Sequence, residues 1–237
     1  HLLLLMIVVK ANGFELKSGY TIHIACDTTE MEPVVKSALK MLVNDFQAVL
    51  SSDVCIGKEG NIIINKDTTL LDKRKEAFQL KVSDDQLYVT GSDAHGVAYG
   101  ILEISRLIGV SPWEWWADVM PLKRSSFSLA NGYVNLQAPS VEFRGIFIND
   151  EDWGLMPWSS LHYEPWHKPG RIGPKTNARI FELMLRLRAN TYWPAMHECT
   201  QPFFLTQGNR EVAEQYGIYI GGSHCEPMAS STAGEWR

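Results

Sequence analysis

The sequence lacks the motifs that mark several common enzyme classes. It has no G-x-G-x-x-G stretch for a dinucleotide, no P-loop for a nucleoside triphosphate and no H-E-x-x-H pair for zinc. The stretch GGSHC at residues 221–225 is not a nucleophile elbow, because its fifth position is Cys rather than Gly. These absences argue against nicotinamide, ATP, zincin and α/β-hydrolase chemistry.

Cysteine and positive charge are also scarce. The four cysteines include no C-x-x-C pair, which argues against a disulfide scaffold. A zinc site made by His197, Cys199, His224 and Cys225 is disfavoured, because the adjacent His224 and Cys225 would point to opposite faces of an extended strand. Lys and Arg number 22 against 27 Asp and Glu, a net charge of −5, and no basic block is present to neutralise phosphates. We therefore expect no metal and no nucleic-acid partner.

Long apolar runs are nearly absent, and the clearest one lies at residues 1–9 (HLLLLMIVV). The tripeptide VKA at residues 9–11 resembles a signal-peptidase site, so residues 1–12 are expected to be a signal-peptide remnant and the protein to be exported to the periplasm or beyond. The alternative is a buried N-terminal strand, since an initiating Met and a basic n-region are missing. No run reaches the ~18 apolar residues of a membrane span, so no membrane partner is expected.

Residues 13–111 alternate between strand-like and helical patterns. Strands are predicted where β-rich stretches occur, at residues 20–25, 61–65, 78–82 and 87–90. Thr29 and Glu32 have capping-box spacing, which predicts a helix that runs to about Leu50. Apolar residues at helical spacing predict a second helix over 96–108. These elements predict a small N-terminal α/β domain.

The rest of the chain divides into a connector and a second α/β unit. Residues 112–140 show no clear periodicity and are expected to connect two domains. From residue 141 three strands alternate with two helices, the first capped by Thr176. This alternation implies a parallel sheet, either open and doubly wound or the start of a (β/α)₈ barrel. A complete barrel needs about 250 residues, so residues 141–237 are expected to be the first βα units of a truncated TIM barrel.

Polar clusters follow each of the three late strands directly. They are Asn149-Asp150-Glu151-Asp152, His197-Glu198 and His224-Cys225-Glu226. Ligands bind at the carboxyl ends of parallel strands, so these clusters predict a binding site. Carboxyl groups there suit glycosidic hydrolysis, which needs an acid and a base, or the binding of sugar hydroxyls. The alternative is that the acids and histidines only cap helices and form loop salt bridges.

All eight tryptophans lie from residue 113 onward. Tryptophan offers a flat apolar face and an N–H donor, which suit either a pyranose ring or a domain interface. Two groups are expected, an interface group (Trp113, Trp115, Trp116) and a substrate group (Trp153, Trp158, Trp166).

Six longer motifs carry a family resemblance. They are DAHGVAYG at 93–100, IGVSPW at 108–113, GIFINDEDWGL at 145–155, IGPK at 172–175, ANTYWPAMH at 189–197 and SHCEPM at 223–228. Taken in this order they resemble glycoside hydrolase family 115, the xylan α-glucuronidases. The first two resemble the small α/β domain that precedes the barrel in that family.

This resemblance implies removal of (4-O-methyl)glucuronic acid from glucuronoxylan by an inverting mechanism, without a metal or organic cofactor. Asp150 and Glu151 are expected to be catalytic, with the acid and the base unassigned between the available carboxylates. Substrate binding is expected from Asn149, Asp152, Trp153, Trp193, His197, His224 and Glu226. The family has a whole barrel and further domains, so these residues alone are expected to be inactive, and a homodimer is expected only of a full-length protein.

Three other hypotheses remain open. A non-catalytic carbohydrate-binding fragment would be retained on glucuronoxylan without turnover. A hexosaminidase-like glycosidase would instead cleave N-acetylhexosaminides. A metal-dependent hydrolase would lose its activity after chelation.

Overall fold

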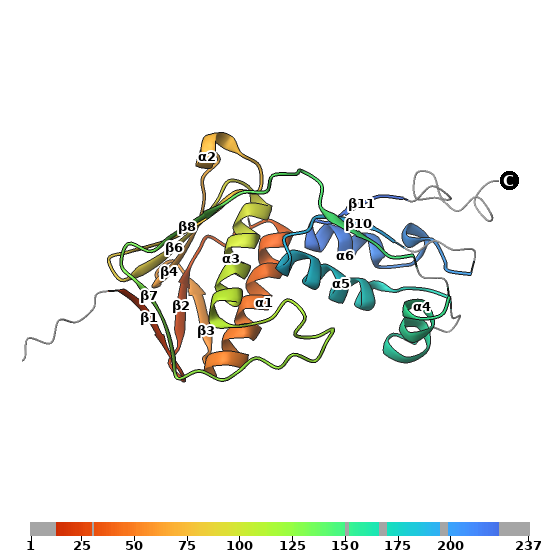
Figure 1. The fold of residues 1–237 in the computed structure, drawn as a ribbon, viewed down its shortest axis with the longest axis horizontal. Helices are drawn as coiled ribbons and strands as arrows, with labels where there is room; N and C mark the ends of the chain where they lie inside the picture. The colour runs from red at the N-terminus through yellow and green to blue at the C-terminus, as the bar shows by residue number, and fades with distance from the viewer. Residues whose placement is uncertain (1–12, 30, 150–151, 166–169, 195–198, 223–237) are drawn as a thin grey trace, which may run out of the picture.

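The computed structural model describes residues 13–29, 31–149, 152–165, 170–194 and 199–222. Two α/β parts lie side by side along the long axis of the molecule (Figure 1). We call residues 13–137 the N-terminal part and residues 145–222 the C-terminal part. The mixed α/β class predicted from the sequence is confirmed by the order of helices and strands. In the described ranges no helix has the length and apolar character needed to cross a membrane.

A six-stranded sheet forms one side of the N-terminal part. Its order is β3 (Val54–Gly57), β2 (Ile22–Ala25), β4 (Ile62–Lys66), β6 (Gln86–Gly91), β5 (Phe78–Ser83) and β8 (Val134–Gln137). The first four strands in this order are parallel, whereas β5 runs antiparallel to both β6 and β8. Burial alternates along β5 and β6, as expected for strands with one face against a core.

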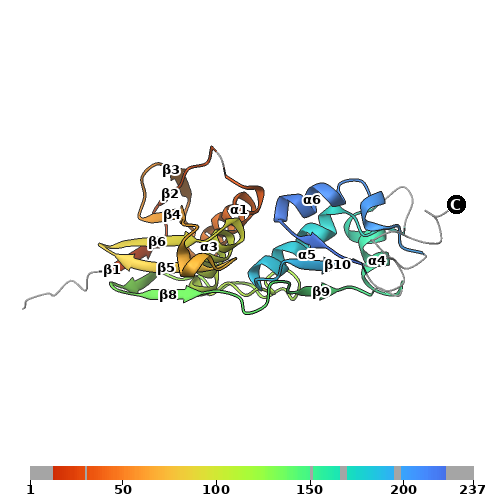
Figure 2. The ribbon, with the colours of Figure 1, turned by 90° about the horizontal axis from the view of Figure 1, so that it is seen from above.

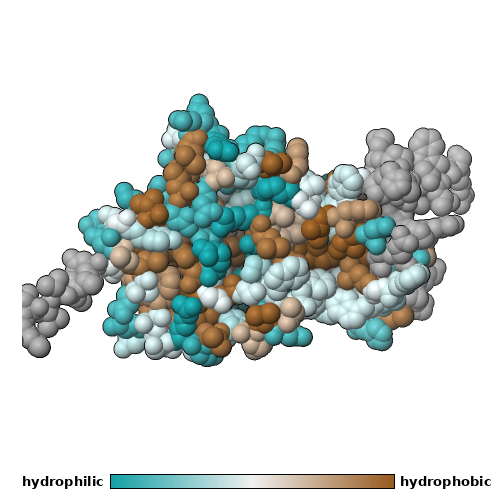
Figure 3. All heavy atoms as spheres, viewed as in Figure 1, coloured by the Kyte–Doolittle hydropathy of each residue, from teal (hydrophilic) through white to brown (hydrophobic). Residues whose placement is uncertain are grey.

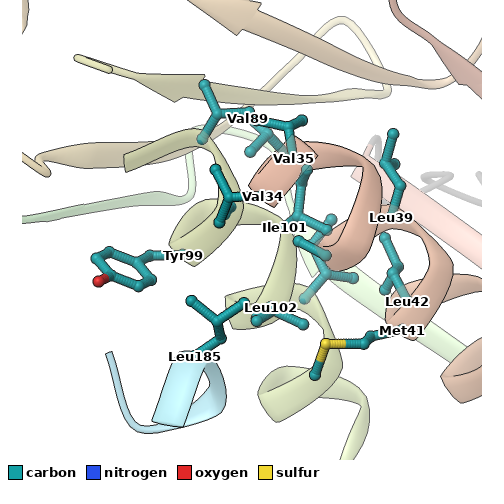
Figure 4. Close-up of a cluster of buried hydrophobic side chains, with 14 of the residues drawn as sticks. Val34, Val35, Leu39, Met41, Leu42, Val89, Tyr99, Ile101, Leu102 and Leu185 are labelled. Carbon is teal, nitrogen blue, oxygen red and sulfur yellow. The ribbon is translucent and has the colours of Figure 1, made fainter. Parts of the chain in front are cut away.

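Helices α1 (Pro33–Leu50) and α3 (Ala94–Ile108) lie between this sheet and the C-terminal part (Figure 2). Their apolar side chains interdigitate, with Val89 of β6 on one side of the cluster and Leu185 of the C-terminal part on the other (Figure 4). The Asp93 carboxylate caps α3 by accepting the Gly96 N–H at 2.8 Å. A second, two-stranded sheet pairs β1 (Gly13–Lys17) with β7 (Ser126–Ala130), and β1 contacts β5 and β6.

The C-terminal part contains three parallel strands joined by helices. The strands are β9 (Gly145–Phe147), β10 (Thr191–Trp193) and β11 (Tyr219–Ile220), with β10 in the centre. The main helices are α5 (Pro174–Arg186) and α6 (Asn209–Tyr216). Shorter turns are α2 (Leu70–Lys73), α4 (Leu155–Trp158), the π-helix η1 (Ser159–Tyr163) and the 3₁₀ helix η2 (Phe203–Leu205). The β-α-β-α-β order matches the alternation predicted from the sequence.

The two parts are held together by packed helices and by ion pairs. Helix α5 contacts α3, and α6 contacts α1. Three arginines of the later chain pair with carboxylates of the N-terminal part: Arg144 with Glu76, Arg186 with Asp45 and Arg188 with Glu103. Because each of these carboxylates is buried, its charge needs compensation. These arginines supply it across the junction, and Arg106 also pairs with Glu103.

Glu103 makes part of this junction sensitive to pH. Burial alone would raise the pKa of Glu103, but hydrogen bonds and charges from Arg106 and Arg188 hold it below the ordinary value of 4.5. Since the pKa is lower in the folded state, the stabilisation is complete above pH 4.5 and is lost as the pH falls through the folded pKa.

We therefore expect Glu103→Gln to lower the free energy of unfolding at pH 7 by about 1.5–3 kcal/mol, because hydrogen bonds to charged groups are lost. The difference from the parent should shrink as the pH falls below 4.5. Urea unfolding at several pH values measures this difference in the free energy of unfolding. The control is Glu214→Gln, which removes one carboxylate of an exposed ion pair. A difference that stays constant from neutral to acidic pH would contradict this account.

The predicted starts of two helices are wrong. Helix α1 begins at Pro33 rather than after Thr29, because the Thr29 N–H and hydroxyl both donate to Asp27 Oδ1, at 2.9 and 2.6 Å. Thr176 lies inside α5, where its N–H donates to the buried Glu164 carboxylate at 3.0 Å. The cap of α5 thus comes from a residue in another segment.

Four strands were not predicted at all. They are β1, β3, β7 and β8. Of these, β7 and β8 lie within residues 112–140, which showed no periodicity, and they pair with β1 and β5 of the N-terminal part. The β7 and β8 stretches of the predicted connector are therefore sheet structure of that part.

Candidate functional site

The carboxyl ends of β9, β10 and β11 meet at one edge of the C-terminal part. Thr191 is in register with Gly145 on one side and with Tyr219 on the other. The ladder extends past the strands, since the Ile148 N–H donates to the Trp193 carbonyl at 3.0 Å and the Gly221 N–H to the Tyr192 carbonyl at 2.9 Å. The segments that follow the three strands therefore leave from the same edge, which is where a parallel sheet binds ligands. We call this the β9–β11 edge.

The predicted site residues divide into two groups. The first group belongs to the described part of the chain and contains Asn149, Asp152, Trp153, Trp158 and Trp193. The second group lies outside the described residues and contains Asp150, Glu151, Trp166, His197, His224 and Glu226. Asn149 follows β9 and Trp193 ends β10, so these two predicted residues come from adjacent strands.

Trp193 presents its indole at the β9–β11 edge. It is 42% exposed and lies edge to face against Phe147, with ring centroids 6.0 Å apart. On its other side the indole approaches Gly221 so closely that a Cβ at residue 221 would overlap Nε1. Glycine after β11 thus leaves room for the indole, a relation between distant segments that the sequence prediction missed.

Asp152 and Cys199 join the loop after β9 to the loop after β10. Asp152 is half-buried and has a left-handed φ of 71°. Local desolvation and then a hydrogen bond to the Asp152 carboxylate raise the pKa of the Cys199 thiol. The thiol therefore stays neutral and gives Asp152 a polar partner. The sequence analysis considered Cys199 only as a ligand of the disfavoured zinc site and did not predict it to bind substrate. Its position shortly after β10 is the signal that points to it.

Trp153 and Trp158 have different environments although both were predicted to contact substrate. Trp153 is 90% exposed beside Asp152. Trp158 stacks on Tyr163 at 4.9 Å with an interplanar angle of 7°, and packs edge to face against Trp115 at 6.2 Å. Trp158 is therefore part of an aromatic cluster, while Trp153 remains accessible to a ligand.

The loop between β9 and α5 is fixed by a buried carboxylate. Glu164 accepts the backbone N–H groups of Lys175 and Thr176, at 3.1 and 3.0 Å, and the Thr176 hydroxyl at 3.2 Å. Farther along, the Gln201 N–H donates to the Gly170 carbonyl at 2.8 Å. These bonds tie the loops around the β9–β11 edge to the first turn of α5.

Arg171 lies close to the segment that contains Cys199. Arg171 forms a hydrogen bond with Gln201, on the segment that follows β10. Arg144, by contrast, precedes β9 and pairs with Glu76 at the junction. Arg171 is therefore better placed than Arg144 to meet an acidic ligand. Across the described segments no group of three His, Cys, Asp or Glu side chains is arranged to hold a metal ion.

Comparisons with known proteins agree with this architecture. The profile of Glycosyl hydrolase family 115 matches residues 136–237. The solved structure of BtGH115A, a family GH115 4-O-methyl-α-glucuronidase with specificity for decorated arabinogalactans, is 58% identical with a TM-score of 0.89. That match covers 94% of this chain and 31% of BtGH115A, so the chain spans about a third of the length of that relative. No curated protein matches the chain.

More distant structures share the fold alone. The GH20 exo-β-N-acetylglucosaminidase from Vibrio harveyi, in complex with N-acetylglucosamine, is 16% identical with a TM-score of 0.53, and the match covers 89% of this chain and 33% of that one. A GH138 enzyme targeting pectin rhamnogalacturonan II is 17% identical with a TM-score of 0.52, covering 86% and 24% of the two chains. The profile match over the β9–β11 edge and the high identity to BtGH115A along nearly the whole chain lead to one conclusion: the chain belongs to glycoside hydrolase family 115.

Proposed function

We propose that this chain is part of an α-glucuronidase that removes (4-O-methyl)glucuronic acid from polysaccharide side chains. The observation that carries the proposal is the β9–β11 edge. There the motif containing Asn149 and Asp152 and the motif containing Trp193 lie on adjacent parallel strands, inside the segment that matches the family profile. A glycosidase of this kind is expected to place its acid, its base and its sugar-binding groups at such an edge.

The three parallel strands are proposed to begin a (β/α)₈ barrel within residues 141–237. Their β-α-β-α-β order supports this. All three residues of β9 are exposed, and hydrophobic residues gather over the region of β9 to β11 (Figure 3). Further strands of a barrel would cover such apolar residues. Because the barrel closes the pocket only when complete, residues 1–237 alone are proposed to be inactive.

Inversion is the proposed stereochemical course. Asp150 and Glu151 are the proposed catalytic pair, and in an inverting enzyme the two carboxyl groups stand about 6.5–9.5 Å apart with water between them. Asp152, which is hydrogen-bonded to the Cys199 thiol, is assigned to substrate binding and to fixing the loop after β9. Trp153 and Trp193 offer exposed indoles to sugar rings, and His197, His224 and Glu226 are proposed to complete the pocket.

An acidic sugar also needs a cation. The net charge of the chain is −5, so attraction of a uronate must come from a local group rather than from the overall field. Arg171, in the segment beside Cys199, is the proposed partner of the uronate carboxylate. A guanidinium suits this role because it binds a carboxylate through two parallel hydrogen bonds.

Glucuronoxylan is the proposed polysaccharide, and a decorated arabinogalactan is the second candidate. The second is favoured by BtGH115A, whose specificity is for decorated arabinogalactans and whose identity to this chain is 58%. A polymeric substrate is also consistent with the proposed export to the periplasm or beyond, and a homodimer is proposed for a full-length enzyme.

The test is glucuronic acid release from both polysaccharides by an enzyme that continues through a complete barrel, run beside residues 1–237. We expect release by the longer protein only. Proton NMR of the first product should show the β-anomer, since inversion converts an α-glucuronide into β-glucuronic acid. Initial formation of the α-anomer would contradict inversion, and no release of glucuronic acid from either polysaccharide by the longer protein would contradict the proposed function.

A further inference from the structure

A large pocket lies in the N-terminal part, at the carboxyl ends of β2, β3 and β4 beside the first turn of α1. Its volume is about 870 Å³, within the range of about 300–1,000 Å³ that small-molecule sites occupy. Its lining includes Cys26 and Asp27 after β2, Gly57 and Lys58 at the end of β3, and Asn65 in β4.

The position of this pocket in the sheet is the one that favours ligand binding. The chain passes from β2 through α1 to β3 on one side of β2, and then crosses to β4 on the other side (Figure 2). The direction in which strands are added therefore reverses at β2. Such a switch point opens a crevice outside the carboxyl ends of the strands, where open α/β sheets bind their ligands.

Charge identifies the chemistry that the pocket would accept. Asp27 Oδ1 accepts hydrogen bonds from the Thr29 N–H and hydroxyl, at 2.9 and 2.6 Å, and Glu32 forms an ion pair with Lys66. Lys58 also lines the pocket and has no direct ion pair with a residue that the structure describes. Hydrogen bonds from Thr29 and then the charge of Lys58 lower the pKa of the Asp27 carboxyl, so the Lys58 ammonium acts on Asp27 only without direct contact. Its hydrogen-bond donors are therefore available to an anionic group of a ligand.

The remaining lining suits a sugar ring. Thr28 and Asn65 offer a hydroxyl and an amide, which can both donate and accept hydrogen bonds with sugar hydroxyls. Met31, Val35 and Val97 supply an apolar wall from the α1 and α3 side. A ligand that carries one carboxylate, several hydroxyls and an apolar C–H face would satisfy all three kinds of group.

We propose that this pocket binds a uronic acid unit, with its carboxylate at Lys58 and its ring against the apolar wall. The choice of a uronate rests in part on the proposed function, since an α-glucuronidase meets glucuronic acid as product and as substrate side chain. The location rests only on the pocket and its lining.

Cys26 provides a readout that is independent of hydrolysis. This half-buried thiol lines the pocket, whereas the thiol of Cys55 is exposed on β3 and does not. Alkylation of each cysteine by iodoacetamide is followed by mass spectrometry of the peptides, with D-glucuronate, D-glucose or acetate added. We expect glucuronate to slow labelling of Cys26 and not of Cys55, and glucose and acetate at the same concentration to protect neither. No protection by glucuronate, or equal protection by acetate or glucose, would overturn the proposal.

Two variants and one matched control test where glucuronate binds. Lys58→Gln is expected to weaken glucuronate protection by about tenfold, because a charge-assisted hydrogen bond is lost. Lys81→Gln makes the same charge change on an exposed residue of β5 and should leave protection unchanged. Gly57→Leu should abolish protection by filling the pocket, and it should fold normally because no heavy atom lies within 4 Å of a Cβ added there. Protection that survives Lys58→Gln and Gly57→Leu would place the ligand elsewhere.

The labelling experiment can fail or succeed independently of the test of the proposed function. Glucuronic acid release by the complete enzyme should be the same with Lys58 or Gln at residue 58. Normal release without protection of Cys26 would overturn only the uronate pocket. Protection of Cys26 in an enzyme that releases no glucuronic acid would overturn only the proposed hydrolysis.

Discussion

Replacing Arg186 with methionine is expected to lower the free energy of unfolding by about 3–5 kcal/mol, because the change leaves a buried carboxylate without its cation. Arg186 donates to Asp45 Oδ2 and Oδ1 at 2.8 and 2.9 Å, and the two side chains are only 8% and 6% exposed. Glu114 lies 3.7 Å from the same guanidinium. Urea unfolding followed by circular dichroism measures the loss.

Two further variants separate the cost of an orphaned charge from the cost of lost packing. Arg210→Met removes an exposed arginine that pairs with Glu214 and should change the stability by less than about 1 kcal/mol. The double variant Arg186→Met with Asp45→Leu should recover most of the stability, since a well-packed apolar pair often replaces a buried ion pair without loss. An Arg186→Met protein as stable as the parent would show that Asp45 is compensated in another way.

The largest effect on activity is expected at Asp150 and Glu151. In the complete enzyme, Asp150→Asn and Glu151→Gln should each lower the rate of glucuronic acid release by about 10²–10⁴-fold, the usual contribution of a general acid or base. The reason is their place in the sequence: Asp150 and Glu151 come after Asn149, which itself follows β9. Glu211→Gln, an exposed change in α6, serves as the control.

The pH dependence of the two variants assigns their roles. The group that acts as the base sets the acidic limb of the rate profile, and the group that acts as the acid sets the alkaline limb. Each variant should therefore lose a different limb. If both variants keep the parent rate, the catalytic carboxylates lie on other strands, and residues 150 and 151 only bind sugar hydroxyls.

Sequence patterns predicted the elements that depend on nearby residues. Helix α3 ends at Ile108 as expected, and Gly109 closes it with a left-handed φ of 102°. Strands β2, β4, β5 and β6 lie within a residue or two of their predicted ranges because their apolar residues face one core. The parallel alternation also predicted that the chain after β9 and after β10 would leave from one edge of the sheet.

Features that depend on distant partners were not predictable. Strand β7 forms because it pairs with β1, which lies near the other end of the N-terminal part in sequence. The cap of α5 is a carboxylate at Glu164, and nothing at Thr176 itself indicates it. Likewise, Trp158 follows the acid cluster in sequence, but its neighbour in space is Trp115. Local spacing contains no information about such contacts, since loop geometry determines them.

The packing of α5 and α6 on α1 and α3 has a consequence for cooperativity. Buried residues of both parts, from Phe14 to Ile218, belong to one continuous apolar cluster. The six-stranded and the three-stranded sheet are separate in topology, but because they share this cluster we expect the two parts to unfold together. The helices of the C-terminal part bury their apolar residues against the N-terminal part. Separating the two parts by proteolysis would therefore expose apolar surface on both pieces and favour their aggregation.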